Sequence, residues 1–177
     1  MKRIVVISSS LIIFFVAIII VFFLLFPRKY IDEIDKYSTR YNLPSYMVAS
    51  IINIESGYDV MAHSTADAMG LMQLKLTTAM DMARGTGIDI DNVTIYDKDI
   101  NIMLGCKYMS YLLDMFDGNE TNALASYNWG LTNVKEWIAS GNKDESGTIE
   151  NIPVKETRDY LKKYKLNRFV YKNIYKL

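Results

Sequence analysis

The feature that most constrains this chain of 177 residues is an apolar segment near its N-terminus. Residues 4–26 are hydrophobic except for three consecutive serines, and residues 11–26 contain no polar side chain. A helix of that length can cross a hydrocarbon core about 30 Å thick. Large side chains continue up to Pro27, where a cleaved signal peptide would have small residues at its cleavage site. The segment therefore predicts an uncleaved signal anchor.

This predicted anchor divides the chain into two regions. Residues 1–28 are expected to form a cytoplasmic tail and one transmembrane helix, and residues 29–177 a single domain on the extracytoplasmic side. Two basic residues flank the apolar segment on each side, so charge alone barely decides its orientation. A short tail with the large domain exported is the simpler arrangement, and a retained cytoplasmic domain is the alternative.

The cysteine and histidine content narrows the chemistry that the predicted domain can support. Cys106 is the only cysteine, so it can form no intramolecular disulfide, and we expect it to be a small core residue. His63 is the only histidine, which leaves no Cys/His zinc cluster and no Ser/His or Cys/His catalytic pair. No metal or organic cofactor is implied. Carboxylates, hydroxyls and amides remain as candidate functional groups.

Charge is distributed unevenly along a chain whose net charge is zero. Residues 155–177 carry eight basic and two acidic side chains, a net charge of +6, whereas residues 30–154 carry eight basic and eighteen acidic ones, a net charge of −10. A basic C-terminal tail can lie against an anionic polymer or lipid head groups, or it can be a solvated helix face. Nothing in the pattern resembles a nucleic-acid-binding module.

Apolar spacings of three and four residues, separated by helix-starting and helix-ending residues, predict a mainly helical domain. The predicted helices cover residues 31–41, 45–56, about 71–83, about 99–116, a short stretch before Gly130, another before Gly141, and residues 153 to about 165. The last nine residues, "FVYKNIYKL", are amphipathic and have no predicted position.

Glu55 is out of place in the helix that is predicted to end at Gly57. The positions that share its side of that helix, Val48, Ile51 and Ile52, are all apolar, so the carboxylate completes an apolar stripe. Burying a carboxylate costs several kcal/mol if it is ionised, or else it takes up a proton at a raised pKa. By itself, Glu55 is either a helix-end acid or an acid held protonated for use.

Three further stretches contain polar residues where packing alone does not place them. Gln73 lies among apolar residues in "GLMQL", Tyr127 and Asn128 stand at a helix end in "ALASYNWG", and Tyr160 closes the helix start "IPVKETRDY". Each has a structural explanation when it is taken singly: a satisfied backbone group for Gln73, core packing for Tyr127, and a surface ion-pair cluster for the charges before Tyr160.

Taken together, "ES" at Glu55, "GLMQ", "YNWG" and "IPVKETRDY" occur in the order and spacing that resemble the catalytic domain of lytic transglycosylases of the soluble (SLT) type, a branch of the lysozyme-like superfamily. The resemblance spans about residues 31–165. It implies a mainly α, lysozyme-like single catalytic domain, here preceded by one transmembrane helix. It also implies an enzyme that cleaves the β-1,4 bond between N-acetylmuramic acid and N-acetylglucosamine in peptidoglycan and leaves 1,6-anhydromuramoyl products.

The resemblance gives Glu55 the role of the single catalytic carboxylate, protonated at rest. It implies that Glu55 donates its proton to the glycosidic oxygen and then takes the proton of the muramic C6 hydroxyl. The implied partners are peptidoglycan strands, the membrane through the anchor, and an unassigned machine of the cell envelope, with the domain facing the cell wall. Substrate-binding roles are implied for the residues at matching positions: Ser56, Gln73, Tyr127, Asn128 and Tyr160.

The chain departs from the family pattern around the "GLMQ" block. Asp67 stands where the family usually has Gly, and Lys75 and Leu76 stand where it usually has Met and Pro. Lys75 is expected to place a cation near the cleft, which could favour anionic groups such as stem-peptide carboxylates. Ordinary glycosidases use a second carboxylate. The candidates are Asp59 and Asp67, although their polar, turn-rich loop favours simple solvation.

Two other functions stay open on the same residues. A goose-type lysozyme-like hydrolase would add water at the same bond. A non-catalytic peptidoglycan-binding scaffold would use the anchor and the cleft to tether a machine to the glycan. The presence of Glu55 together with Gln73, Tyr127 and Tyr160 argues against the scaffold, because an inactive site commonly loses its acid first.

Overall fold

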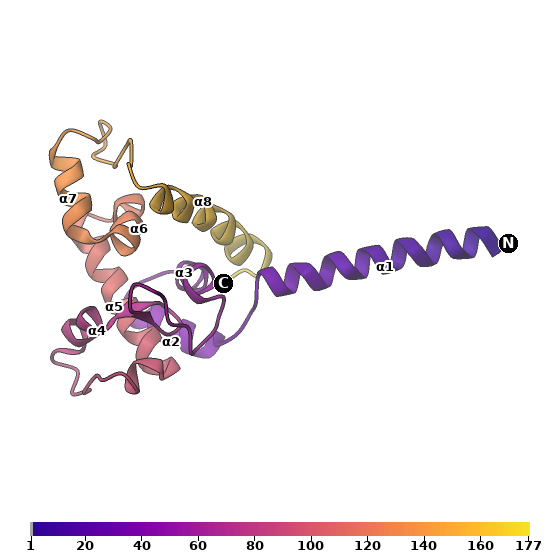
Figure 1. Cartoon of the computed structure of the whole chain (residues 1–177), viewed down its shortest axis with the longest axis horizontal. Coiled ribbons are helices and arrows are strands. Elements are labelled where there is room, and N and C mark those ends of the chain that lie inside the picture. The colour runs from indigo at the N-terminus through magenta and orange to yellow at the C-terminus, as the bar shows by residue number, and fades with distance from the viewer. Residues whose placement is uncertain (1) are drawn as a thin grey trace.

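A long helix, α1 (Lys2–Leu25), projects from a helical body that contains the rest of the chain (Figure 1). The computed structural model describes residues 2–177, with side chains from residue 11 onward. Within the part described with its side chains, no helix is both long enough and apolar enough to cross a membrane. The first ten residues of the predicted tail and anchor lie outside that part.

The body is mainly helical, as the apolar spacing predicts. The predicted helices over residues 31–41, 45–56 and 99–116 form within one residue of their expected bounds. Among the described residues, seven α-helices follow α1: α2 (Ile31–Arg40), α3 (Ser45–Ser56), α4 (Leu76–Ala83), α5 (Lys98–Met115), α6 (Glu120–Trp129), α7 (Leu131–Ala139) and α8 (Lys155–Phe169). Strands β1 (Ala68–Met69) and β2 (Leu74–Lys75) pair antiparallel, a 3-10 turn η1 (Thr94–Tyr96) precedes α5, and a π-helical turn η2 (Val170–Ile174) follows α8.

Helix α3 lies in the hydrophobic core and packs against α2 and α8. It begins after Pro44, whose fixed φ suits a helix start. It ends at Gly57, whose φ of 59° is the left-handed conformation that favours glycine. Ile51 and Ile52 are fully buried. The same helix therefore holds Glu55 one turn beyond its buried apolar stripe.

The predicted helix over residues 71–83 is wrong for its first five residues, which form a turn and strand β2. The buried side chain of Asn101, on α5, binds the backbone of this turn. Its amide oxygen accepts a hydrogen bond from Met72 N at 2.8 Å, and its amide nitrogen donates to Met69 O at 3.0 Å. Gly70 packs against the same side chain with a φ of 76°, where a Cβ would collide with it. These contacts from a distant helix replace local helical hydrogen bonds.

The C-terminal end of the chain returns to the base of α1 (Figure 1). Helix α8 begins two residues later than predicted and runs four residues longer, and η2 continues it. The Tyr171 hydroxyl donates to Pro27 O and the Tyr175 hydroxyl donates to Phe26 O, both at 2.7 Å. The amphipathic C-terminal residues are thereby fixed beside the end of α1.

Candidate active site

A cleft of about 500 Å³ lies between α3, α6, α8 and the chain around the β1–β2 hairpin. Five of the six predicted site residues line it, although they come from four separate stretches of sequence. The hairpin side adds residues from the loop before β1. The lining side chains discussed below are Glu55, Gln73, Tyr127, Asn128, Glu156, Asp159, Tyr160 and Lys163, and the loop contributes Ser64, Thr65 and Ala66.

Glu55 is half-buried at the C-terminal end of α3, where the cleft wall is partly apolar. Loss of solvation is the main reason that the pKa of its carboxyl group rises from 4.5 to about 7. The negative charge of Glu156 raises this pKa further, whereas the Tyr160 hydroxyl and the charge of Lys163 lower it. A large fraction of Glu55 is therefore protonated near neutral pH, which is the state that a general acid needs.

Tyr160 lies on the face of α8 that lines the cleft. Its hydroxyl is buried and has no hydrogen-bond partner of good geometry among the described residues. Burial, followed by the negative charge of Glu55, raises the pKa of this hydroxyl well above its ordinary value. It therefore stays protonated and can donate a hydrogen bond to the Glu55 carboxylate or to a ligand in the cleft.

Tyr127 and Asn128 hold two walls of the cleft together at the end of α6. The Tyr127 hydroxyl donates to Met72 O at 2.8 Å, and so ties α6 to the turn that carries Gln73. The Asn128 side-chain oxygen accepts a hydrogen bond from Thr157 Oγ1 at 2.8 Å, and so ties α6 to α8. Both residues line the cleft, and these bonds fix its width.

Gln73 and Ser56 occupy different positions relative to the cleft. Gln73 lines it, and its amide nitrogen donates to Gly70 O at 2.9 Å and to Ala62 O at 3.1 Å. Because both bonds use the nitrogen, the amide oxygen is the group that Gln73 can offer to a ligand. Ser56 is not among the lining residues; its hydroxyl donates to Leu71 O at 2.8 Å and holds the end of α3 against the hairpin.

The two candidate second carboxylates lie outside this cleft. Asp59 is exposed and accepts a hydrogen bond from Met61 N at 2.9 Å, as turn-forming aspartates commonly do. Asp67 is exposed and lies 3.3 Å from the His63 ring nitrogen Nε2. It lines a neighbouring pocket of about 420 Å³ that also contains Lys75. The predicted cation at Lys75 thus belongs to the pocket beside the cleft.

Three charged residues of α8 line the cleft and were not assigned to it from the sequence. Asp159 is adjacent to Tyr160, whereas Glu156 lies four residues before Tyr160 and Lys163 three residues after it, which places these two on its face of α8. That spacing could have identified them once Tyr160 was placed. Asp159 forms an ion pair with Lys155. The hydrogen bond that Lys155 donates in this pair is the main reason that the pKa of the Asp159 carboxyl group is lowered.

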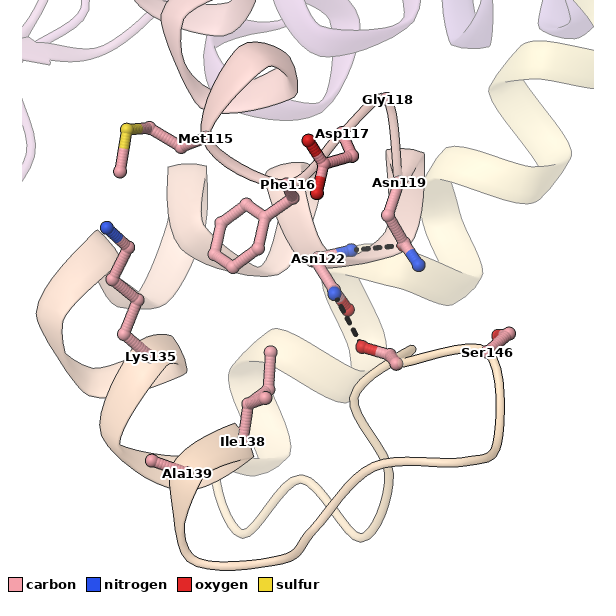
Figure 2. Close-up of a pocket in the computed structure, with 11 residues that line it drawn as sticks. Met115, Phe116, Asp117, Gly118, Asn119, Asn122, Lys135, Ile138, Ala139 and Ser146 are labelled. Carbon is pink, nitrogen blue, oxygen red and sulfur yellow. Dashed lines mark hydrogen bonds between the residues drawn. The ribbon is translucent and has the colours of Figure 1, made fainter.

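A second pocket, of about 520 Å³, lies at the opposite end of α6 and does not contain Glu55 (Figure 2). Its polar groups hold the loop between α7 and α8. The Asn122 amide nitrogen donates to Gly147 O at 2.9 Å, and the Asn122 backbone N–H donates to Asn119 Oδ1 at 3.1 Å. None of the six predicted site residues lines this pocket. The candidate active site is therefore the cleft that contains Glu55.

Solved structures of known proteins share this fold. Lytic transglycosylase Slt from Pseudomonas aeruginosa, solved as an inactive mutant, superposes with a TM-score of 0.77 at 29% identity, covering 85% of this chain and 25% of that one. The 70-kDa soluble lytic transglycosylase from Escherichia coli gives a TM-score of 0.74 at 28% identity, covering 84% of this chain and 25% of that one. The predicted mainly helical, lysozyme-like class is thereby confirmed.

Residues 32–149 match the family described as Transglycosylase SLT domain, and the chain belongs to this family. The soluble lytic murein transglycosylase of Escherichia coli K12 is 30% identical over 141 residues, which are 77% of this chain and 22% of that protein. The membrane-bound lytic murein transglycosylase C of Photorhabdus laumondii is 27% identical over 158 residues, 76% of this chain and 44% of that protein. The chain thus spans less than half the length of these relatives.

We expect Tyr127→Phe to lower the free energy of unfolding by about 1–2 kcal/mol, because it leaves the buried Met72 carbonyl without the hydroxyl donor. Urea denaturation of the full chain measures this loss. Tyr108→Phe is the matched control: its ring centroid lies 5.4 Å from that of Tyr127, but its hydroxyl makes no hydrogen bond within the described part of the chain. An equal loss in both variants would contradict the assigned role of the Tyr127 hydroxyl.

Proposed function

We propose that this chain is a peptidoglycan lytic transglycosylase. It cleaves the β-1,4 bond between N-acetylmuramic acid and N-acetylglucosamine and leaves a 1,6-anhydromuramoyl end. The observation that carries the proposal is the environment of Glu55: a half-buried carboxyl in the cleft, with a pKa of about 7 and a protonated tyrosine hydroxyl beside it. Membership of the SLT family supports the same reaction.

In the proposed mechanism, Glu55 acts first as an acid and then as a base. The protonated carboxyl donates its proton to the glycosidic oxygen, the bond to the muramic C1 breaks, and N-acetylglucosamine leaves with a free 4-hydroxyl. The Glu55 carboxylate then takes the proton of the muramic C6 hydroxyl while O6 attacks C1. This closes the anhydro ring, consumes no water and returns Glu55 to its protonated form. A pKa of about 7 serves both steps near neutral pH.

The other cleft residues are proposed to bind or position the glycan. The buried Tyr160 hydroxyl is free to donate a hydrogen bond to the Glu55 carboxylate after proton transfer, and such a bond favours the charged form. Gln73 offers its amide oxygen to a sugar hydroxyl or N–H group. Tyr127 and Asn128 contact the glycan where they line the cleft. Their side-chain hydrogen bonds hold α6 to the turn that carries Gln73 and to α8. Ser56 contributes by holding the end of α3 beside the substrate.

We infer further that residues 1–28 anchor the chain in a membrane and that residues 29–177 act as the catalytic domain on the side of the cell wall. The apolar side chains described on α1 are exposed, as they would be in contact with lipid: Phe14, Phe23 and Leu24 are 61%, 57% and 72% exposed. One relative, 27% identical over 158 residues, is named as membrane-bound. Peptidoglycan and the membrane are the partners that this arrangement implies.

Mass spectrometry of the muropeptides that the detergent-solubilised full chain releases from purified peptidoglycan tests the proposed reaction. Anhydro-muropeptides are expected from the wild type and from Asp59→Asn, whose carboxylate lies outside the cleft. Reducing-end products would instead indicate the goose-type hydrolase, for which the carboxylates of Glu156 and Asp159 in the cleft are candidate water-activating bases. Glycan binding without any release would contradict the enzyme and favour the scaffold.

The rate of release is expected to fall about tenfold per pH unit above roughly pH 7, because the general acid must be protonated. Glu156→Gln should move this descending limb to lower pH, because it removes a charge that raises the pKa of Glu55. Tyr160→Phe should move it to higher pH, because it removes a hydroxyl that lowers that pKa. Initial rates between about pH 5 and 9 measure the shifts.

The control for these two variants is Glu136→Gln. It makes the same charge change as Glu156→Gln on the exposed surface of α7, outside the residues that line the cleft. Its profile should coincide with that of the wild type. Movement of the limb in the same direction for Glu156→Gln and Tyr160→Phe would contradict the assignment of Glu55 as the titrating acid.

A further inference from the structure

The end of α8 and the turn η2 expose apolar and basic side chains together. Leu166, Phe169 and Ile174 are 57%, 58% and 50% exposed, although large apolar side chains usually pack inside. The exposed Lys172 lies between them and the exposed Lys165 and Lys176 flank them, and no acidic residue occurs after Asp159. We call this surface the C-terminal face and define it by Lys165, Leu166, Phe169, Lys172, Ile174 and Lys176.

The C-terminal face is fixed to the base of α1, where the apolar helix joins the body (Figure 1). The hydroxyls of Tyr171 and Tyr175, which alternate with residues of the face, donate to Pro27 O and Phe26 O at 2.7 Å. The Tyr175 ring also packs edge-on against Phe22 of α1, with the ring centroids 6.0 Å apart. The face and the end of α1 therefore form one continuous surface.

The side chains along this surface change from apolar to cationic, as a bilayer changes from acyl chains to head groups with depth. The described part of α1 is apolar, and all of its residues from 11 to 25 except Phe22 are exposed, as in lipid-facing helices. At its end come Arg28 and Lys29, with the Arg28 guanidinium 5.9 Å from the centroid of the Tyr175 ring. Lys172 and Lys176 each directly follow one of the two tyrosines that are bonded to the end of α1. Apolar residues followed by cations match a hydrocarbon core followed by an anionic head-group layer.

We propose that the C-terminal face lies in the head-group layer of an anionic lipid bilayer. Leu166, Phe169 and Ile174 reach the boundary with the acyl chains, and the ammonium groups of Lys165 and Lys176 pair with lipid phosphates, whereas that of Lys172 lies 5.1 Å from the centroid of the Tyr46 ring. The inference rests on the proposed anchoring by α1 and is independent of the reaction assigned to Glu55. An anionic wall polymer would account for the lysines but not for three exposed large apolar side chains.

This contact sets the position of the cleft relative to the membrane. Helix α8 carries both Tyr160, which lines the cleft, and Phe169, which belongs to the C-terminal face. The two residues are nine positions apart, which is about 14 Å along a helix at 1.5 Å per residue. A face held in the head groups therefore keeps the cleft close to the lipid surface. The substrate that this position selects is glycan lying next to the membrane.

Site-directed spin labelling of the full chain in bilayer nanodiscs tests the contact. A label is placed at Phe169→Cys or Ile174→Cys, and Cys106 does not compete because it is fully buried. Val93→Cys is the solvent control, since Val93 is 78% exposed in the loop before α5. Ile19→Cys, on α1, reports insertion of the anchor. Collision rates with lipid-soluble oxygen and with a water-soluble nickel chelate give the depth of each label.

The expected result is severalfold lower access of the nickel chelate to the labels at Phe169 and Ile174 than at Val93 in phosphatidylglycerol-containing bilayers. The difference should shrink in pure phosphatidylcholine. Lys165→Gln combined with Lys176→Gln should likewise shrink it in the anionic bilayer, because each lysine near an anionic surface favours contact by about fivefold. Lys135→Gln combined with Lys143→Gln, on α7 and the loop after it, is the matched control and should change nothing.

The contrary outcomes are distinct. Labels at Phe169 and Ile174 that are as open to the chelate as Val93, beside an Ile19 label in the lipid, would overturn the inference and leave the anchor intact. An Ile19 label in water, with no chain in the lipid fraction, would overturn both the contact of the C-terminal face and the proposed membrane anchor. Unchanged depth together with weaker sedimentation on insoluble peptidoglycan in the Lys165→Gln, Lys176→Gln variant would assign the face to the wall polymer. Muropeptide products report the reaction separately in every case.

Discussion

Glu55→Gln is expected to lower kcat/KM for release of anhydro-muropeptides by about 10²- to 10⁴-fold, which is the range that general acid–base catalysis contributes. Glutamine has nearly the same shape and still fits beside Tyr160, but it cannot donate or accept the proton in either step. Because one carboxyl serves both steps of the proposed mechanism, the loss should lie at the upper end of that range. Quantitative mass spectrometry of product formation measures it.

The same substitution is expected to stabilise the fold at pH 8. The pKa of Glu55 is about 7 in the folded chain, above its ordinary value of 4.5, so the folded state binds the proton more tightly. The contribution of this tighter proton binding to the free energy of unfolding is fully present below about pH 4.5 and is lost as pH rises through about 7. Glutamine avoids the cost of burying the charge, which is on the order of 2–3 kcal/mol. Urea denaturation at pH 8 and at pH 4.5 measures the difference.

Activity and stability thus move in opposite directions, which separates a catalytic acid from a structural one. Asp59→Asn is the control for removal of a nearby carboxylate, because Asp59 is exposed and outside the cleft. It should keep nearly full activity and nearly the same stability. A Glu55→Gln chain that retained a tenth of the wild-type activity, or that unfolded more easily at pH 8, would refute the role assigned to Glu55.

Local pattern predicts the helices and the unusual position of Glu55 but not the hairpin. Helix α3 was predictable because its apolar spacing, Pro44 and Gly57 all act within one helix. The hairpin was not, because the residue that holds it, Asn101, is 29 positions away from Met72 on another helix. Three of the five residues over 71–75 are apolar (Leu71, Met72 and Leu74) and all five suit a helix, so only the tertiary contact distinguishes the two conformations.

The cleft was predictable from the resemblance at the level of which residues gather, but not of what each one does. Tyr127 was expected to orient Glu55 or contact the glycan, and the structure directs its hydroxyl to Met72 O, 55 positions away. A hydrogen bond between residues so far apart cannot be predicted from the local sequence pattern. The charges at Glu156 and Lys163 were within reach of sequence reasoning, because a spacing of three or four residues from Tyr160 places them on its face of α8.

Asn101→Leu is expected to give the largest loss of stability, about 3–6 kcal/mol in the free energy of unfolding. Asn101 is fully buried and makes three hydrogen bonds of 2.8 to 3.0 Å, to Met72 N, Met69 O and Ile95 O. Leucine fills a similar volume but leaves all three backbone groups buried without partners, each at a cost of about 1–3 kcal/mol. Urea denaturation of the full chain measures the loss.

Asn122→Leu is the matched comparison, because it too replaces a buried asparagine that binds backbone at a distance. Its partners, Gly147 O and Ile149 N, belong to the loop at the opposite end of α6 from the cleft (Figure 2). Both variants should therefore be less stable, but only Asn101→Leu should also lose kcat/KM under conditions where each remains folded, because its turn carries Gln73. Equal effects on kcat/KM in the two variants would show that the Asn101 bonds hold the core without positioning the cleft.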